Sequence, residues 1–524
     1  MSGIAVLPVI DRDEAHFAQA SRQMVQTGNY FQIRFQEKTR FQKPPGINWL
    51  QAASVKLFSN AEASAIWPYR IPSVLAALIS ILLTYFLARK FDNAKTARLS
   101  AALLASTLLL VVETHMAVID ASLLTTVLLM QIALWIIYRN AFEKVQTHWI
   151  WPLCFWLAMS LGFVLKGVTP LVGFLTIVAL CLLEKRINWL RRLHVFSGLA
   201  LFILLNLAWI LMVNDAENSN YLMQMIHKDL IPKLHGGHES HGKPPLFHLL
   251  ILAVTFWPAS LFFWQGARYA IEKRHEKEVK FLLAWILPTW FFFEFMPTKL
   301  PQYVLPTFPA IALLCAMGIS KFTEAELPSK LLRFLQVLWS LISIGLALSL
   351  LSLPYLLMHR WSMVALIISV LITGLSLVAV YFSWKGAYQR ASLTIGLMAF
   401  ISYPLIFSSL LPQLKPLWLT KDAAKLVDKS LISVDKPLLV VGFEEPSLVF
   451  NLDTKTVKFS NPDTAGQLIQ DDSSRLALVE EKALQNWQQK GKNLSIVGSL
   501  KGFDYSKGSW LTLLLVKQNT SGDS

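Results

Sequence analysis

Carboxylates and lysines stand at the ends of long apolar runs, where ionisable side chains are rare unless they serve a function. In chain order the residues of this kind are Asp13, Glu14, Lys43, Arg70, Glu113, Asp120, Lys166, Glu294, Lys299 and, with the last of them, Tyr303. A carboxylate can orient or deprotonate an attacking group, and lysines can stabilise negative charge on a leaving phosphate. The pattern favours a reaction on an anionic, phosphate-bearing substrate.

Three histidines, His235, His238 and His241, follow one another at intervals of three residues. Imidazoles are common metal ligands, but this Gly-rich loop offers no rigid scaffold for a coordination sphere. We therefore favour a solvated loop, in which His238 and His241 could contact a substrate. We expect no required cofactor, and a divalent metal remains the weaker reading.

Several of these residues also have a purely structural reading. Asp13 and Glu14 suit the first turn of a helix, where negative charge interacts favourably with the helix dipole. Asp120 could simply pair with Lys166. A position at the membrane interface is the alternative for Lys43, whereas Lys299, between Pro297 and Pro301, could simply anchor its loop. The functional reading is favoured because these residues all fall on one predicted side of the membrane.

The composition is that of a membrane protein. Of 524 residues, 54% are hydrophobic and 15% charged, against about 25% charged in soluble domains; the mean hydropathy is +0.47. This excludes a disordered chain. The net charge of +15 does not indicate a nucleic-acid partner, since the apolar residues form long runs rather than a core under a basic surface. The three cysteines lie within apolar runs, so no disulfide framework is indicated.

Apolar runs long enough to approach the roughly 20 residues of a membrane span predict an α-helical polytopic membrane protein with about twelve spans. They cover residues 71–89, 99–113, 118–138, 149–165, 169–184, 195–213, 246–266, 280–296, 303–320, 331–355, 362–384 and 391–411. Alternate loops contain 20 Lys and Arg against 6 in the loops between them. The rich side is predicted to be cytoplasmic, which places both long polar ends outside.

A chain that begins outside needs a means of translocation. We therefore expect a further apolar helix before this sequence, and thirteen spans in the complete protein. Residues 1–70 are expected to form a first periplasmic loop with amphipathic interfacial helices, 71–411 the transmembrane catalytic domain, and 412–524 a small periplasmic α/β domain. Within the last region, residues 437–442 and 510–516 are predicted strands, and 421–429 and 483–489 predicted helices.

A set of short motifs resembles those of C-type glycosyltransferases that use lipid-phosphate sugars. The nearest branch is that of the bacterial aminoarabinose lipid A transferases, which are related to the protein O-mannosyltransferases. The motifs are DRDEAHFAQA at 11–20, KPPG at 43–46 with Trp49, IWPYR at 66–70, Glu113 with IDA at 119–121, KG at 166–167, GHESHG at 237–242 with Pro244 and Pro245, and PTKLPQYVLP at 297–306. Their order and spacing match over residues 10–320.

The resemblance implies that Asp13 is the essential carboxylate, with Glu14 beside it, and that Lys43, Lys299 and Tyr303 lie at the donor phosphate. This sequence has Gln42 where the aminoarabinose enzymes have a glutamate that helps to hold zinc. It also has Val118 where relatives often have a basic or polar residue. Neither the zinc site nor the identity of the substrate is carried over.

These observations lead to one hypothesis and a rival. The hypothesis is an inverting transferase that moves a sugar from a polyprenyl-phosphate donor to lipid A or another envelope glycolipid, at the periplasmic face of the bacterial inner membrane. Asp13 would act with Glu14 or Asp120. The donor phosphate would meet Lys43, Lys166, Lys299 and Tyr303, and support would come from Arg70, Glu113, His238, His241 and Glu294. The rival is a transporter or flippase of a lipid-linked anion, which predicts inverted repeats and binding near the midplane.

Overall fold

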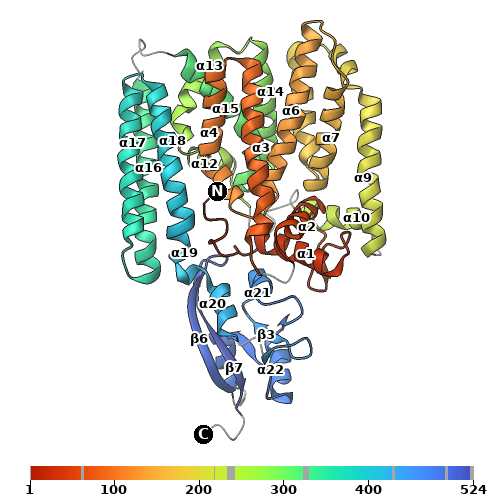
Figure 1. The fold of residues 1–524 in the computed structure, drawn as a ribbon, viewed down its shortest axis with the longest axis vertical. Coiled ribbons are helices and arrows are strands. Elements are labelled where there is room, and N and C mark those ends of the chain that lie inside the picture. The colour runs from red at the N-terminus through yellow and green to blue at the C-terminus, as the bar shows by residue number, and fades with distance from the viewer. Residues whose placement is uncertain are drawn as a thin grey trace.

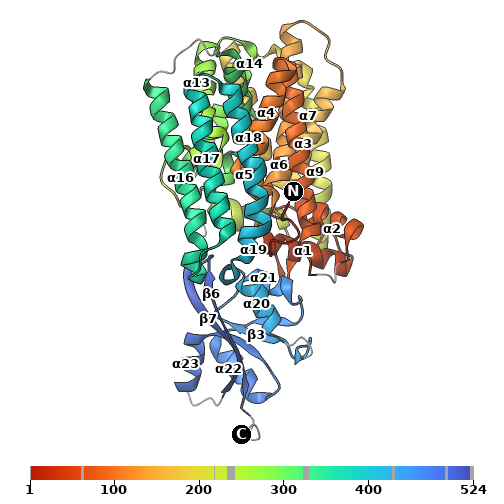
Figure 2. The same cartoon turned by 60° about the vertical axis from the view of Figure 1, so that its left-hand side comes forward.

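A computed structural model describes residues 2–60, 64–217, 219–232, 242–322, 330–427, 431–489 and 494–519. Long helices stand side by side in a bundle (Figure 1). Two short helices of the N-terminal region, α1 (Asp13–Thr27) and α2 (Gly46–Phe58), lie across one end of this bundle, and the C-terminal sheet lies at the same end (Figure 2). The two polar ends of the sequence therefore meet on one side of the bundle.

Apolar helices make up the bundle. The hydrocarbon core of a membrane offers no hydrogen-bond partners, and a helix satisfies its backbone N–H and C=O groups internally. They are α3 (Trp67–Phe91), α4 (Ala94–Ser106), α5 (Leu108–Thr114), α6 (Asp120–Phe142), α7 (Ile150–Leu165), α8 (Thr169–Glu184), α9 (Val195–Glu217), α12 (Phe247–Thr255), α13 (Phe263–Glu272), α14 (Lys277–Phe295), α15 (Phe308–Lys321), α16 (Lys330–Met358), α17 (Met363–Trp384) and α18 (Tyr388–Leu405). Within the described ranges, seven helical segments are long and apolar enough to cross a membrane, or nine if two bent pairs each form one span. The chain is a multi-pass membrane protein.

Shorter elements connect these helices. They are η1 (Asn188–Leu193), α10 (Tyr221–Met225), η2 (Ile226–Leu230), η4 (Ala259–Phe262), η5 (Pro301–Thr307), η6 (Ile406–Leu410), α19 (Leu411–Gln413) and η7 (Lys415–Leu417). The spans α6 and η5–α15 are largely buried, whereas α9 and α16 are largely exposed. The bundle thus has α6 and α15 at its centre and leaves apolar faces of α9 and α16 for the lipid.

Two of the predicted spans are bent in the structure. The run 99–113 bends by 63° between α4 and α5, and the run 246–266 bends by 109° between α12 and the η4–α13 helix. Pro258 lies in the second break and cannot continue a helical hydrogen-bond ladder. The amide of Leu108, at the first break, donates to the carbonyl of Trp257 (2.7 Å) at the second. This hydrogen bond therefore pairs an amide at the first break with a carbonyl at the second.

The N-terminal region folds around α1 and α2, with the short strands β1 (Arg34–Phe35) and β2 (Lys38–Thr39) between them. Helix α1 has two acidic residues in its first turn and ends at Gly28, which adopts a left-handed φ of 71°. Gly46 begins α2, and a Cβ there would lie 2.6 Å from the carbonyl oxygen of Val164 in α7. The glycine of the KPPG motif therefore lets α2, and the lysine before it, approach the end of α7.

The elements from α20 onward form what we call the C-terminal unit. It comprises α20 (Leu419–Leu426), β3 (Leu438–Val441), α21 (Pro446–Asn451), β4 (Val457–Phe459), α22 (Pro462–Asp471), β5 (Ala477–Glu480), α23 (Glu481–Gln489), β6 (Leu494–Asp504) and β7 (Ser509–Gln518). The sheet order is β4-β3-β5-β7-β6. Strand β3 pairs in parallel with β4 and β5, and β7 pairs antiparallel with β5 and β6. The two predicted strands and two predicted helices of this region are confirmed as β3, β7, α20 and α23.

Candidate functional site

A cavity of about 1610 Å³ lies between the N-terminal region, the ends of several bundle helices and the C-terminal unit. Its walls include most of the residues singled out in the sequence, which come from positions nearly 300 residues apart. They are Asp13, Glu14, Lys43, Glu113, Asp120, Lys166 and Tyr303, and Gln42 and Val118 line it as well. The structure therefore brings the predicted carboxylates and three of the predicted phosphate-binding residues to one place.

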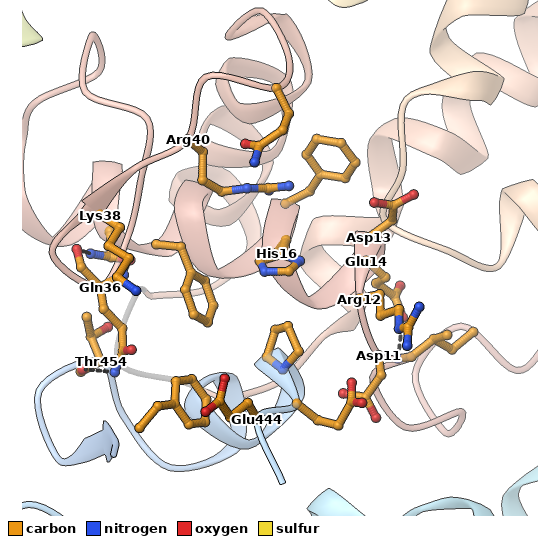
Figure 3. A pocket seen from close by; sticks show the side chains of 18 of the residues that line it. Asp11, Arg12, Asp13, Glu14, His16, Gln36, Lys38, Arg40, Glu444 and Thr454 are labelled. Atoms are coloured by element: carbon orange, nitrogen blue, oxygen red, sulfur yellow. Dashed lines mark hydrogen bonds between the residues drawn. The ribbon is translucent and has the colours of Figure 1, made fainter. Parts of the chain in front are cut away.

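Asp13 is the first residue of α1 and its side chain is exposed in the cavity (Figure 3). The residue before it, Arg12, has a φ of 66°, a conformation that costs a non-glycine residue roughly 1–2 kcal/mol. The C-terminal unit stabilises this segment: the Arg12 guanidinium donates to the carbonyl of Ser506 (3.0 Å), and the amide of Asp11 donates to the Tyr505 hydroxyl (2.7 Å). Contacts from the C-terminal unit therefore help to fix the backbone position of Asp13.

Glu14 has no free oxygen to offer a substrate. Its two carboxylate oxygens accept from Nε and Nη2 of Arg70, each at 2.8 Å, and both side chains are completely buried. The same oxygens accept from the amides of Ala117 (2.7 Å) and Ile10 (2.8 Å). Arg70 also donates to the carbonyls of Leu7 and Pro8. This network fixes the segment that carries Asp13, so Glu14 and Arg70 position the site rather than react in it.

Asp120 and Lys166 form the ion pair that was the structural alternative for both residues. Lys166 Nζ donates to Asp120 Oδ1 at 2.8 Å, and the side chains are 15% and 11% exposed. Asp120 begins α6, and Lys166 directly follows α7. The ammonium also lies 5.0 Å from the centre of the Tyr303 ring. Because both residues line the cavity, the pair still presents a cation to a bound substrate.

Glu113 is a deeply buried carboxylate on the wall of the cavity. It lies near the end of α5 and is 4% exposed. Its Oε2 atom has no hydrogen-bond partner in the part of the chain that the structure describes. A buried polar atom of this kind is costly unless something satisfies it, and an arriving substrate hydroxyl would do so.

Lys43 meets a carboxylate that the sequence reasoning did not single out. Its ammonium lies 3.0 and 3.1 Å from the two oxygens of Asp229, which belongs to the π-helical turn η2. The Tyr221 hydroxyl, in α10, contacts the carbonyl oxygens of Arg40 (2.6 Å) and Lys43 (2.7 Å). The α10–η2 segment therefore holds both the backbone and the charge of Lys43. Asp229 lies within a charged stretch that the sequence shows, but nothing there pairs it with Lys43.

Other candidate residues lie elsewhere. Lys299 is 4% exposed and is not among the cavity-lining residues; its ammonium donates to the carbonyls of Met296 (2.7 Å) and Lys243 (3.2 Å), as the loop-anchor alternative expects. Glu294 is also outside the cavity and lies 3.4 Å from Nδ1 of His248. Arg70 does not line the cavity and binds Glu14 and the carbonyls of the segment before Asp13. His235, His238 and His241 lie outside the described residues. Among the residues that are described, no three His, Cys, Asp or Glu side chains are grouped to hold a metal ion.

Two titratable groups near Asp13 were not assigned a role from the sequence. Burial and the nearby Glu445 raise the pKa of Asp11 to about 7. Burial and the charge of Arg40 lower the pKa of His16 to about 3, so its ring is neutral at physiological pH. Figure 3 shows His16 in the middle of the cavity wall, between Arg40 and Asp13. Its neutral imidazole can donate one hydrogen bond to a substrate and accept another, but it does not act as a general acid.

Comparisons with known proteins show similarity to one group of sugar transferases over part of the chain. Residues 42–211 match the family profile described as dolichyl-phosphate-mannose-protein mannosyltransferase. The chain is 29% identical over 307 residues to undecaprenyl phosphate-alpha-4-amino-4-deoxy-L-arabinose arabinosyl transferase 1 of Pseudomonas fluorescens Pf-5, covering 58% of this chain and 54% of that one. It is 28% identical over 333 residues to the corresponding transferase of Yersinia pestis Pestoides F, covering 60% and 56%. The chain spans about half the length of the curated relatives it matches.

Solved structures show the same fold. ArnT from Cupriavidus metallidurans bound to undecaprenyl phosphate superimposes with a TM-score of 0.76 at 16% identity, covering 98% of this chain and 95% of that one. An oligosaccharyltransferase from Archaeoglobus fulgidus gives 0.51 at 10% identity, covering 98% and 71%. The resemblance to C-type glycosyltransferases of the aminoarabinose transferase type, which the motifs indicate, is confirmed.

Proposed function

We propose that this chain, similar as it is to the aminoarabinose transferases, moves a sugar from a polyprenyl-phosphate donor to a glycolipid of the lipid A kind. The reaction would take place at the periplasmic face of a bacterial inner membrane, and residues 1–70, 71–411 and 412–524 would be its first loop, membrane domain and periplasmic domain. The relatives in Pseudomonas and Yersinia act on undecaprenyl phosphate-linked aminoarabinose, as their names state. A solved relative holds undecaprenyl phosphate itself.

The chemistry needs a base for the acceptor and positive charge for the leaving group. An oxygen of the acceptor attacks the anomeric carbon as the bond from that carbon to the phosphate oxygen breaks, and the polyprenyl phosphate departs with the bonding electrons. The configuration at the anomeric carbon inverts. Asp13 orients the acceptor and takes its proton. Lys43 and Lys166 stabilise the charge that accumulates on the phosphate, while Tyr303 packs against Lys166.

One observation carries the proposal: Asp13, Lys43 and Lys166 line a single cavity at the end of the bundle where both polar regions lie. Asp13 is exposed there, and the two lysines are held by carboxylates of the chain itself. A base and two cations around one cavity supply what an acceptor hydroxyl and a departing phosphate require. The donor chain would lie among the helices, and no nucleotide pocket is needed.

The test is a transfer assay in membranes that contain the full chain, with products followed by mass spectrometry of lipid A and other glycolipids. Wild-type protein should add one glycosyl unit, and Asp13→Asn should lower kcat by about 10²-fold or more. Asp471→Asn, which changes an exposed carboxylate on α22 outside the cavity, is the matched control. Full activity of Asp13→Asn at normal expression would remove Asp13 from the mechanism.

The transporter alternative makes a different prediction. It expects the substrate site near the middle of the membrane, whereas this cavity lies where the bundle meets the C-terminal unit. Reconstituted proteoliposomes separate the two ideas. Movement of a lipid-linked anion without a new covalent product would favour the transporter and contradict the transferase.

A further inference from the structure

The cavity has a wall that the catalytic residues do not use. Lys38 and Arg40 of the N-terminal region lie across His16 from Asp13 (Figure 3), and Lys455, Lys458 and Arg475 of the C-terminal unit line the same cavity. Glu37, Asp435 and Glu444 are carboxylates that also line it. Lys38, Lys455 and Lys458 are exposed. Figure 3 shows Lys38 and Thr454 together on this side, across His16 from Asp13.

Side-chain amides tie the two halves of this wall together. Gln36 Nε2 donates to the carbonyls of Thr454 (3.1 Å) and Val457 (2.6 Å), and Gln19 Nε2 lies 2.5 Å from the hydroxyl of Thr454. The backbone that carries Lys455 and Lys458 is thereby fixed against the hairpin that carries Lys38. The charges therefore converge from two regions of the chain and do not lie on a loose loop.

The volume leaves room for a second ligand. A cavity of about 1610 Å³ exceeds the roughly 300–1,000 Å³ of sites that hold one small molecule. In the proposed reaction a donor headgroup, with its phosphate at Lys43 and Lys166, would fill the part of the cavity next to Asp13. The basic wall, where the N-terminal region meets the C-terminal unit, is then left for the acceptor.

We infer that Lys455 and Lys458 of the C-terminal unit, with Lys38 opposite, bind an anionic group of the acceptor, namely a phosphate on a glycolipid headgroup. This inference rests on the proposed function and extends it to acceptor selection. The phosphate bound here is distinct from the one that departs with the donor. Its contacts orient the acceptor across His16, so that the accepting oxygen reaches Asp13.

The experiment compares Lys455→Ala/Lys458→Ala with wild type in the full-length protein, using phosphorylated and dephosphorylated forms of one glycolipid acceptor. With the phosphorylated form we expect the acceptor KM to rise about tenfold, with the donor KM unchanged. With the dephosphorylated form, wild type and variant should have the same acceptor KM. The matched control is Lys421→Ala/Lys482→Ala, which removes two exposed lysines of the same unit that do not line the cavity.

The outcomes are separable. If wild type transfers sugar and the double variant keeps the wild-type acceptor KM, the acceptor wall is wrong while the proposed function stands. An equal loss with both acceptor forms would assign the lysines to folding and also overturn the wall. If wild type transfers sugar to no glycolipid, or only to a protein, the proposed glycolipid reaction itself fails.

Discussion

The carboxylate of Asp229 lies 3.0 and 3.1 Å from the ammonium of Lys43, so the lysine assigned to the donor phosphate is already paired within the chain. The side chains of the pair are 17% and 23% exposed, and both residues line the cavity. A donor phosphate that binds Lys43 must therefore compete with Asp229. This competition lowers the affinity for the donor and can be measured.

Asp229→Asn should lower the donor KM by about three- to tenfold, because the phosphate no longer displaces a charged partner. Initial rates at varied donor concentration in membranes would show the change. Asp215→Asn, which alters an exposed carboxylate near the end of α9, should leave the donor KM as it is. A higher donor KM in Asp229→Asn would mean that Asp229 orients Lys43 for the phosphate and does not compete with it.

Lys166→Gln should lower kcat by roughly 10²-fold, since it removes one cation from the leaving phosphate. Asp120→Asn should have a smaller effect on kcat, because the ammonium stays in the cavity beside Tyr303. Single-turnover rates at saturating donor would compare the two variants. Lys185→Gln, at the exposed end of α8, is the control for removing a lysine. Equal losses in both variants would show that the ion pair is needed as a unit.

Arg70→Met should destabilise the folded protein by about 3–5 kcal/mol, because it leaves the buried Glu14 carboxylate without its partner. Thermal unfolding in detergent would report the loss. The control is Arg139→Met, whose pair with Glu143 is partly exposed and should be worth no more than about 1 kcal/mol. An unchanged unfolding midpoint in Arg70→Met would exclude the structural role given to the Glu14–Arg70 pair.

Stability should fall as the pH rises towards neutrality, and Asp11 should be one cause. Its pKa is about 7 in the folded protein against 3.8 for an unperturbed aspartate side chain, so the folded state binds this proton more tightly than the unfolded state. The contribution of protonated Asp11 is complete below about pH 4 and is lost as the pH passes through 7. Asp11→Asn should therefore lose less stability than wild type between pH 5 and pH 8.

Unfolding midpoints at these two pH values would test this, with Asp471→Asn, which keeps Asp11, expected to behave as wild type. The physical cause of the raised pKa is the burial of Asp11 against the C-terminal unit, together with the nearby charge of Glu445; the amide of Ser447, which donates to Asp11 Oδ1 (3.2 Å), opposes the rise. If wild type and Asp11→Asn had the same pH dependence, another group would have to be responsible.

Much of the site could be predicted because charged side chains are rare within and beside membrane spans, and those that occur there usually have a function. Asp13, Asp120 and Lys166 mark the ends of apolar runs, and the predicted sidedness alone puts them at one face. The strands β3 and β7 and the helices α20 and α23 of the C-terminal unit were also visible in the local pattern, whereas α21, β4, α22, β5 and β6 were not predicted. The breaks at Thr107 and Pro258 were not, because an apolar run has the same composition whether it is straight or bent.

The partners of the candidate residues could not be predicted, since a contact between distant segments leaves no local pattern. Asp229 pairs with Lys43 across 186 positions, and Tyr505 meets Asp11 across 494. Lys299 shows the opposite error: its motif suggests a phosphate contact, whereas its ammonium is taken up by the carbonyls of its own loop and of Lys243.

The contacts from Tyr505 and Ser506 to the segment before Asp13 have a consequence for biosynthesis. These two residues follow every bundle helix in the order of translation, so the ribosome makes them after the membrane helices have been inserted. Until the C-terminal unit has been made and has folded, the cavity lacks one wall and the backbone of Arg12 lacks its support. The cavity is therefore complete only after all the bundle helices and the C-terminal unit have been synthesised.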